Sequence, residues 1–209
     1  MAASALLGVL VVVALPDAAA PPPVKGEVRM PSSTILVLYY SRTGTTARLG
    51  DEIAKRTGAD VEKLVDTKDR AGFGGFMRSL FDAIRKNGTT LKPLTLDPAA
   101  YDLVVIGTPD WGQSMSAPVR TFLASYRGRL RNVAFFLTDG TSDHAKIFAE
   151  MAEAADRKPV AVLGIPHIDV VEGRFVERAT VFSDALSASL SATAGERPAA
   201  GAEEPRLSP

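Results

Sequence analysis

The residues from Thr34 to Arg48 read TILVLYYSRTGTTAR, and this stretch decides the fold. It begins with six apolar residues, Ile35 to Tyr40, four of which are β-branched or aromatic. That composition is typical of a strand buried on both faces, as in a parallel sheet. A polar turn from Ser41 to Thr46 follows, and apolar residues at helical spacing then lead to Gly58, a predicted helix C-cap. The stretch therefore predicts a strand, a turn and a helix.

The turn itself predicts an anion-binding site. The first turn of a helix has N–H groups without internal partners and lies at the positive end of the helix dipole, so it can hold a phosphate group. Four hydroxyl side chains add donors, and one glycine lets the backbone approach a ligand closely. The turn lacks the lysine of a Walker loop and two of the three glycines of a dinucleotide fingerprint. The residues expected to bind are Ser41, Arg42, Thr43, Gly44, Thr45 and Thr46.

The letters SRTGTT resemble the phosphate loop of the flavodoxin family, whose pattern is (S/T)-x-T-G-x-T. The matching positions are Ser41, Thr43, Gly44 and Thr46. In that family the loop wraps the phosphate of FMN, so the resemblance implies FMN as the cofactor. It also implies a flavodoxin-like fold for the segment from Pro31 to Leu190.

The rest of the chain alternates between strand and helix patterns. Further strands are expected at Val61–Leu64, Leu103–Ile106, Val133–Leu137 and Val160–Ile165. Further helices are expected at Phe76–Lys86, Ala117–Tyr126, His144–Ala155 and Ala179–Leu190. Such alternation predicts an α/β fold: a flavodoxin-like, doubly wound, five-stranded parallel sheet with helices on both faces. Ligands of such sheets bind at the carboxyl ends of the strands, so the loops that follow the first, third and fourth strands should meet in space.

The loop after the third strand, GTPDWGQ, contains the single tryptophan of the chain, Trp111. A flat ring beside a phosphate turn is expected to stack on a planar heterocycle, although a peripheral core position is the alternative. G-T-P-x-W-G is also a common form of the flavin-stacking loop in flavodoxin-like proteins. Asp110 would lower the second reduction potential of a nearby flavin, or it would cap the loop. The predicted binding residues here are Thr108, Pro109, Asp110, Trp111 and Gly112.

The loop after the fourth strand, FLTDGT, resembles the other flavin-contacting loop of the family. That resemblance assigns Thr138, Asp139 and Gly140 to the site, with the Gly140 carbonyl facing the flavin N5. Many flavodoxins have a tyrosine in this loop, and this chain has none. An open flavin face would favour a substrate that meets the flavin directly.

Composition excludes several classes of function. The 209 residues hold 24 Lys and Arg, 24 Asp and Glu, and no cysteine, so thiol chemistry is absent and nucleic acid is not indicated as a partner. No metal-ligand set and no catalytic acid, base or nucleophile is expected. His144 and His167 are interpreted as isolated surface or core residues. Solvated surface charge is the preferred interpretation of Arg42, Arg78 and Arg85, and binding of an anionic substrate is the alternative.

The two ends differ from the central segment. Residues 1–30 contain an apolar run, Ala5 to Leu15, that is too short to span a membrane and lacks the basic flank of a signal peptide. We interpret this leader as an upstream extension before a native start at Met30, which predicts a cytoplasmic protein. A real signal would instead mean secretion. Residues 191–209 are predicted to be a disordered tail.

These observations favour an FMN-binding flavodoxin-like redox protein that transfers electrons through its flavin. One alternative is an FMN-dependent NAD(P)H:quinone-type oxidoreductase acting on a small acceptor. A cofactor-free interaction module with the same fold is the other. The expected partners are a redox partner protein or a small donor or acceptor such as NAD(P)H or a quinone. The neutral charge and the missing tyrosine favour the enzyme.

Overall fold

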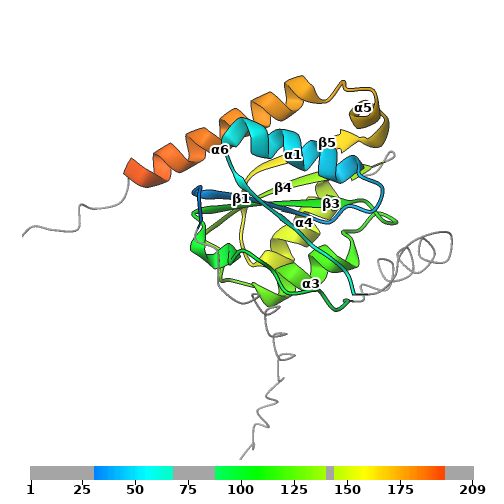
Figure 1. Ribbon diagram of the computed structural model, residues 1–209, viewed down its shortest axis with the longest axis horizontal. Helices are drawn as coiled ribbons and strands as arrows, with labels where there is room; N and C mark the ends of the chain where they lie inside the picture. Colours follow the sequence, from blue (N-terminus) through cyan, green and yellow to red (C-terminus); the bar gives the residue numbers. More distant parts are fainter. Residues whose placement is uncertain (1–30, 68–87, 140–143, 196–209) are drawn as a thin grey trace, which may run out of the picture.

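A computed structural model of the chain describes residues 31–67, 88–139 and 144–195. Its strands form one parallel sheet in the order β2-β1-β3-β4-β5 (Figure 1). They are β1 (Ile35–Tyr39), β2 (Asp60–Lys63), β3 (Leu103–Pro109), β4 (Asn132–Asp139) and β5 (Pro159–Pro166). This is the strand order of flavodoxin-like doubly wound sheets, so the predicted fold class is confirmed.

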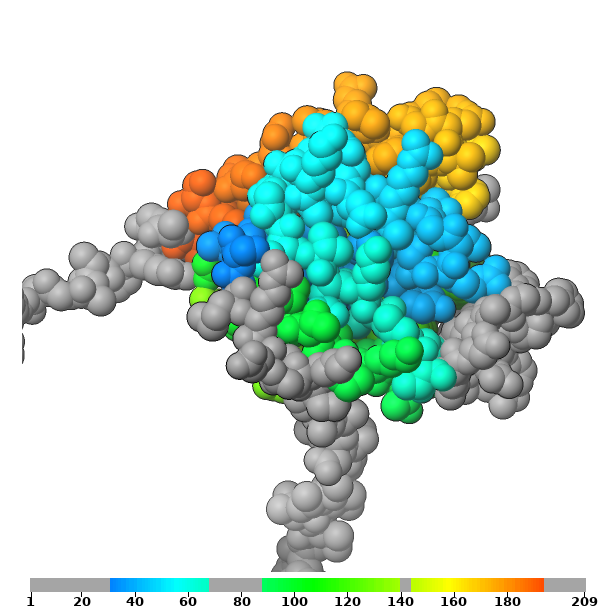
Figure 2. Space-filling view, in the orientation of Figure 1, coloured from blue at the N-terminus to red at the C-terminus, as the bar shows by residue number. Residues whose placement is uncertain are grey.

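Helices cover both faces of the sheet. One face carries α1 (Thr45–Thr57), α5 (His167–Val171) and α6 (Val176–Gly195), and the other carries α3 (Ala117–Ser125) and α4 (His144–Ala155). A short 3-10 helix, η1 (Pro98–Ala100), precedes β3. Helices α1 and α6 pack side by side on the same face (Figure 2). None of the helices that the structure describes is long and apolar enough to cross a membrane.

Strand β1 shows why its sequence is continuously apolar. Its side chains alternate between the two faces of the sheet, so Leu36 and Leu38 join the core under α3 and α4. Val37 and Tyr39 join the core under α1 and α6. Because both faces are covered, every residue of the strand is buried. Full burial of one such side chain stabilises the fold by about 1.5–3 kcal/mol.

A glycine brings α1 close to the sheet. A Cβ atom on Gly50 would lie 2.6 Å from the ring of Tyr39, so no other residue fits this position without movement of that ring. The close contact fixes α1 over β1 and places the first residue of the helix at the carboxyl edge of the sheet. The left-handed Gly58 ends the helix, with a φ of 65°, as predicted.

Some predicted boundaries differ from the observed ones. Helix α4 has the predicted bounds, whereas α6 begins at Val176 and continues to Gly195, so the first residues of the predicted tail are helical. The short helices α5 and η1 were not predicted, because each is under two turns long. The predicted helix Phe76–Lys86, which contains Arg78 and Arg85, lies outside the described residues. So do the leader at 1–30, Gly140 and residues 196–209.

Candidate functional site

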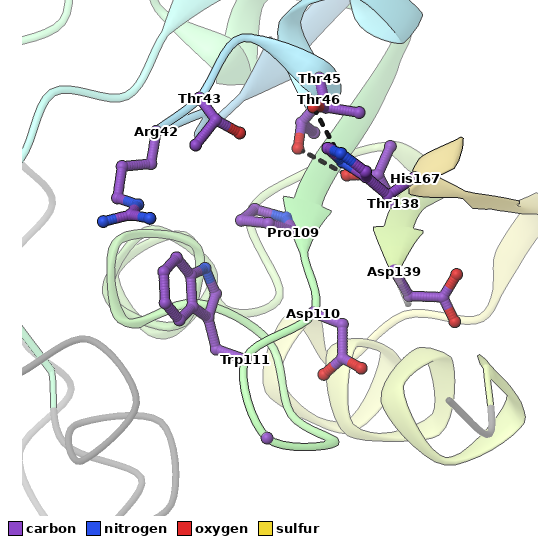
Figure 3. Close-up of a pocket in the computed structure, with 11 residues that line it drawn as sticks. Arg42, Thr43, Thr45, Thr46, Pro109, Asp110, Trp111, Thr138, Asp139 and His167 are labelled. Carbon is purple, nitrogen blue, oxygen red and sulfur yellow. Dashed lines mark hydrogen bonds between the residues drawn. The ribbon is translucent and has the colours of Figure 1, made fainter. Parts of the chain in front are cut away.

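A cavity of about 370 Å³ lies at the carboxyl edge of the sheet, at the ends of β1, β3 and β4 (Figure 3). Its volume is in the range of small-molecule binding sites. The lining residues are Arg42, Thr43, Thr45, Thr46, Pro109, Asp110, Trp111, Gly112, Thr138, Asp139 and His167. All of them except His167 belong to the predicted set. The three loops predicted to meet therefore do meet.

The start of α1 faces this cavity without a side-chain cap. Its N-cap residue, Gly44, has a φ of 92° and makes no side-chain capping hydrogen bond, and no acidic residue lies in the first turn. The first internal bond of the helix runs from the Arg48 N–H to the Gly44 carbonyl, 2.9 Å. The amides between these two residues therefore have no partner within the helix. Such an end suits an anion.

The hydroxyl groups of the turn connect it to neighbouring elements. Thr46 is 2% exposed, and its Oγ1 lies 2.8 Å from Oγ1 of Thr138 at the end of β4. Thr45 Oγ1 lies 3.1 Å from Nδ1 of His167 at the start of α5 (Figure 3). Thr43 is exposed and also lines the cavity. The turn therefore presents polar groups to the cavity while two bonds hold its position.

Trp111 forms the opposite wall of the cavity. It lines the cavity although only 8% of the residue is exposed. The guanidinium group of Arg42 lies over its ring, 5.2 Å from the centroid, at the distance of a cation–π contact (Figure 3). The indole therefore borders the cavity at the predicted loop, with a cation over one of its faces, and its stacking on a cofactor stays a prediction.

The loop that carries Trp111 is held by backbone hydrogen bonds. The Trp111 N–H donates to the Ser114 carbonyl at 3.1 Å, and the Asp110 N–H donates to the Thr138 carbonyl at 2.9 Å. The Asp110 carboxylate accepts from the Gln113 N–H at 2.8 Å and from the Ser114 N–H at 3.3 Å. Asp110 therefore caps the loop and also lines the cavity, while its effect on a flavin reduction potential stays a prediction.

An ion pair between two helices supports the loop that carries Trp111. Glu150 of α4 and Arg120 of α3 are 2.6 Å apart, and their side chains are 14% and 13% exposed. Glu150 also accepts hydrogen bonds from the Ser114 hydroxyl at 2.6 Å and from the Met115 N–H at 3.3 Å. Burial opposes ionisation of Glu150, but the hydrogen bonds from Ser114 and Arg120 outweigh it and hold the pKa of Glu150 below its usual range. Nothing in the sequence pattern pointed to this pair.

Several predicted site residues lie beside the cavity rather than in it. Thr108 is buried, and its Oγ1 lies 3.1 Å from the Ser116 hydroxyl and accepts from the Ser116 N–H at 3.0 Å. It therefore holds the start of α3. Ser41 and Gly44 are not lining residues; the Gly44 N–H donates to the Ser41 hydroxyl at 3.2 Å and shapes the turn. Gly140 lies outside the described residues.

The two histidines, interpreted from the sequence as isolated, both pair with residues that line the cavity. His144 lies 2.7 Å from the carboxylate of Asp139, which is 4% exposed. Its ring packs against Gly164 of β5, where any side chain would collide with it. His167 pairs with Thr45, as described above. A histidine two residues after the predicted fifth strand was the available clue, because that strand ends at the same edge as the site.

The donor set of the cavity defines what it can bind. An uncapped helix start and the three threonine hydroxyl groups of the turn suit an oxyanion, and the indole suits a flat ring. The described residues include no group of three or more His, Asp or Glu side chains placed to hold a metal ion. A planar heterocycle that carries a phosphate group matches both walls.

No protein-family model matches the sequence, and no curated protein is significantly similar to it. Among solved structures, the chain is similar to a flavoprotein in complex with FMN from Lactobacillus acidophilus NCFM, with a TM-score of 0.55 and 23% identity over 66% of this chain and 96% of that one. It is also similar to a proposed flavoprotein from Bacteroides uniformis ATCC 8492, with a TM-score of 0.51 and 23% identity over 66% and 95%. A proposed flavoprotein from Bacteroides eggerthii DSM 20697 has a TM-score of 0.51 and 20% identity over 66% and 93%. Together with the strand order, these similarities show that the chain has the flavodoxin-like fold.

Proposed function

We propose that the chain binds FMN in this cavity and acts as a flavodoxin-like redox protein. The observation that carries the proposal is the uncapped start of α1, which faces the same cavity as Trp111. The amides and hydroxyl groups of the turn would hold the phosphate, and Trp111 would stack against the isoalloxazine ring. Bound FMN supplies one- or two-electron chemistry that no side chain of the cavity provides.

The residues present fit this cofactor. The turn offers donors and carries no carboxylate that would repel a phosphate. Arg42 is exposed and has a flexible side chain, so a ring that enters against Trp111 can replace the guanidinium group. A cation–π contact is then exchanged for aromatic stacking. The FMN in the Lactobacillus acidophilus flavoprotein supports the same assignment.

The first test is the visible spectrum of the purified protein and its titration with FMN. Replacing both Thr43 and Thr46 by alanine removes two donors near the proposed phosphate, and we expect FMN affinity to fall roughly a hundredfold, or about 3 kcal/mol. Thr193→Ala is the matched control, because Thr193 is exposed on α6 and donates to the Ser189 carbonyl of its own helix. Its FMN affinity should equal that of the wild type.

Because Thr46 is buried against Thr138, the double variant also needs an unfolding curve. Thr43→Ala alone changes an exposed side chain and separates loss of binding from loss of folding. A colourless protein that does not bind added FMN would contradict the proposal. With FMN bound, rapid oxidation of NAD(P)H by a quinone would assign an enzyme, and a stable blue neutral flavin radical would assign a one-electron carrier.

A further inference from the structure

The turn that we assign to the phosphate is in contact with an ionisable side chain from another element. His167 is the first residue of α5, directly after β5, and its Nδ1 lies 3.1 Å from Thr45 Oγ1. His167 is exposed and lines the cavity. Figure 3 shows its ring beside Thr45 and Thr46, at the end of the cavity away from Trp111. The imidazole is therefore placed at the proposed phosphate end.

Of the other charged residues of the cavity, Asp110 caps its own loop and Asp139 pairs with His144. Arg42 lies over the indole, and its guanidinium group is the one that a stacked ring would displace. One arginine and two aspartates leave the lining with a formal charge of −1 when His167 is neutral and 0 when it is protonated. A phosphate thus meets a lining of net charge −1 while His167 is neutral, and protonation of His167 removes that repulsive net charge.

Charged groups outside the cavity also surround α5. Arg48 of α1 donates to the Val171 carbonyl at 3.1 Å, and its guanidinium lies over the ring of Phe175. Asp169 of α5 forms ion pairs with Arg174, at 2.8 Å, and with Arg178. Each of these groups has its own partner and does not line the cavity. The charge at the phosphate end of the lining therefore changes chiefly with the protonation of His167.

We propose that protonation of His167 controls how tightly the site holds the phosphate of FMN, an inference that rests on the proposed function. A protonated imidazole has two N–H donors and a positive charge, whereas a neutral one has a single donor. Imidazoles change charge between about pH 5 and 8, so binding should be tightest in mildly acidic solution and weaken as the pH rises. Phosphate binding and protonation of His167 favour each other, as linkage requires.

Riboflavin provides the matched ligand, because it has the ring of FMN without the phosphate. The ratio of riboflavin to FMN dissociation constants isolates the phosphate contribution at each pH. We compare about pH 6.5 with about pH 8.5, because monoester phosphates lose their second proton near pH 6 and remain largely dianionic above it. For the wild type we expect the ratio to fall about fivefold between these two values.

The variants His167→Gln and His144→Gln complete the experiment, with dissociation constants measured by quenching of flavin fluorescence. Glutamine can keep a hydrogen bond to Thr45 without titrating, so His167→Gln should show one ratio at both pH values. His144→Gln removes the other imidazole at this edge and should keep the fivefold change. Unfolding curves confirm that both variants are folded.

Two results would contradict the role of His167 and leave the proposal of FMN binding intact. One is a wild-type ratio of riboflavin to FMN dissociation constants that does not change with pH. The other is a change in that ratio that persists in His167→Gln. A change lost only in His144→Gln would assign the titration to the Asp139–His144 pair and would contradict the role of His167 as well. If FMN does not bind at either pH, the proposed function itself fails. The outcomes of the two proposals are therefore distinguishable.

Discussion

Two regions face each other across the cavity, and their polar groups are used differently. The hydroxyl turn, residues 41–46, has an uncapped helix start and few side-chain bonds. The indole loop, residues 110–116, has its backbone and carboxylate groups bonded within the loop and to the Glu150–Arg120 pair. One region leaves its donors available to a ligand, and the other uses them to hold a ring in place.

This difference assigns the two regions different contributions to binding. Unsatisfied amides at a helix start gain hydrogen bonds only when an anion arrives, so the turn should contribute mainly to affinity. A loop whose polar groups are already satisfied loses little conformational freedom on binding, so it should contribute pre-organisation. Changes in the loop should therefore affect folding and binding together, whereas changes in the turn should affect binding most.

The largest effect is expected from Glu150→Ala. It leaves the guanidinium group of Arg120, a side chain only 13% exposed, without its carboxylate partner, and we expect a loss of about 3 kcal/mol in the free energy of unfolding. Urea unfolding measures this loss, and FMN titration should show weaker binding because the indole loop loosens. The control is Glu153→Ala on the same helix, an exposed position where the change should stay within about 0.5 kcal/mol.

The contribution of Glu150 to the free energy of unfolding should also depend on pH. Because the folded-state pKa of Glu150 lies below its usual range, its contribution to stability is complete above that range and is lost as the pH falls through the folded-state value. The stability difference between wild type and Glu150→Ala should therefore shrink between neutral pH and about pH 3. A difference that stays constant with pH would show that the carboxylate does not hold the loop through its charge.

Trp111→Ala should have the next largest effect. Loss of the stacking wall is expected to weaken FMN binding by about 2 kcal/mol, or roughly thirtyfold. Trp111→Phe keeps an aromatic face and should recover most of this affinity. Both variants are measured by flavin titration, with an unfolding curve because the indole is largely buried. Equal affinities for alanine and wild type would place the flavin ring elsewhere.

The smallest effect is expected from alanine at the two glycines that flank α1. Gly44 and Gly58 flank α1, both have left-handed φ values, and an added Cβ at either position meets nothing within 4 Å. Alanine at either position should therefore cost about 1 kcal/mol of stability for the same backbone reason. Only Gly44→Ala should also weaken FMN binding, because only that end faces the cavity. Equal binding by the two variants would remove the turn from the site.

The fold could be predicted because buried parallel strands leave a strong pattern. Runs such as Ile35–Tyr40 and Val133–Leu137 are apolar at nearly every position, since both faces of the sheet are covered. Because ligands of such sheets bind at the carboxyl ends of the strands, three loops could then be predicted to meet without any knowledge of their contacts. Helix α5 escaped prediction because a five-residue helix has too few turns to show periodicity.

The site was less predictable where contacts depend on the exact position of an element. Strand β3 runs to Pro109, beyond the predicted end at Ile106, so Thr108 is still within the strand and its side chain is buried against Ser116. His167 meets Thr45 because β5 ends, and α1 begins, at the carboxyl edge of the sheet. Glu150 and Arg120 are ordinary helix charges in the sequence and become partners only when α3 and α4 pack.

The cavity is lined by residues from Arg42, in the loop after the first strand, to His167, directly after the last. Such a site is complete only when β1, β3, β4 and β5 are aligned, so a bound ligand should stabilise the domain and not one loop alone. At a hundred times its dissociation constant, a ligand that binds only the folded state adds about 2.7 kcal/mol to the free energy of unfolding. The proposed cofactor would then stabilise the folded chain as well as supply its chemistry.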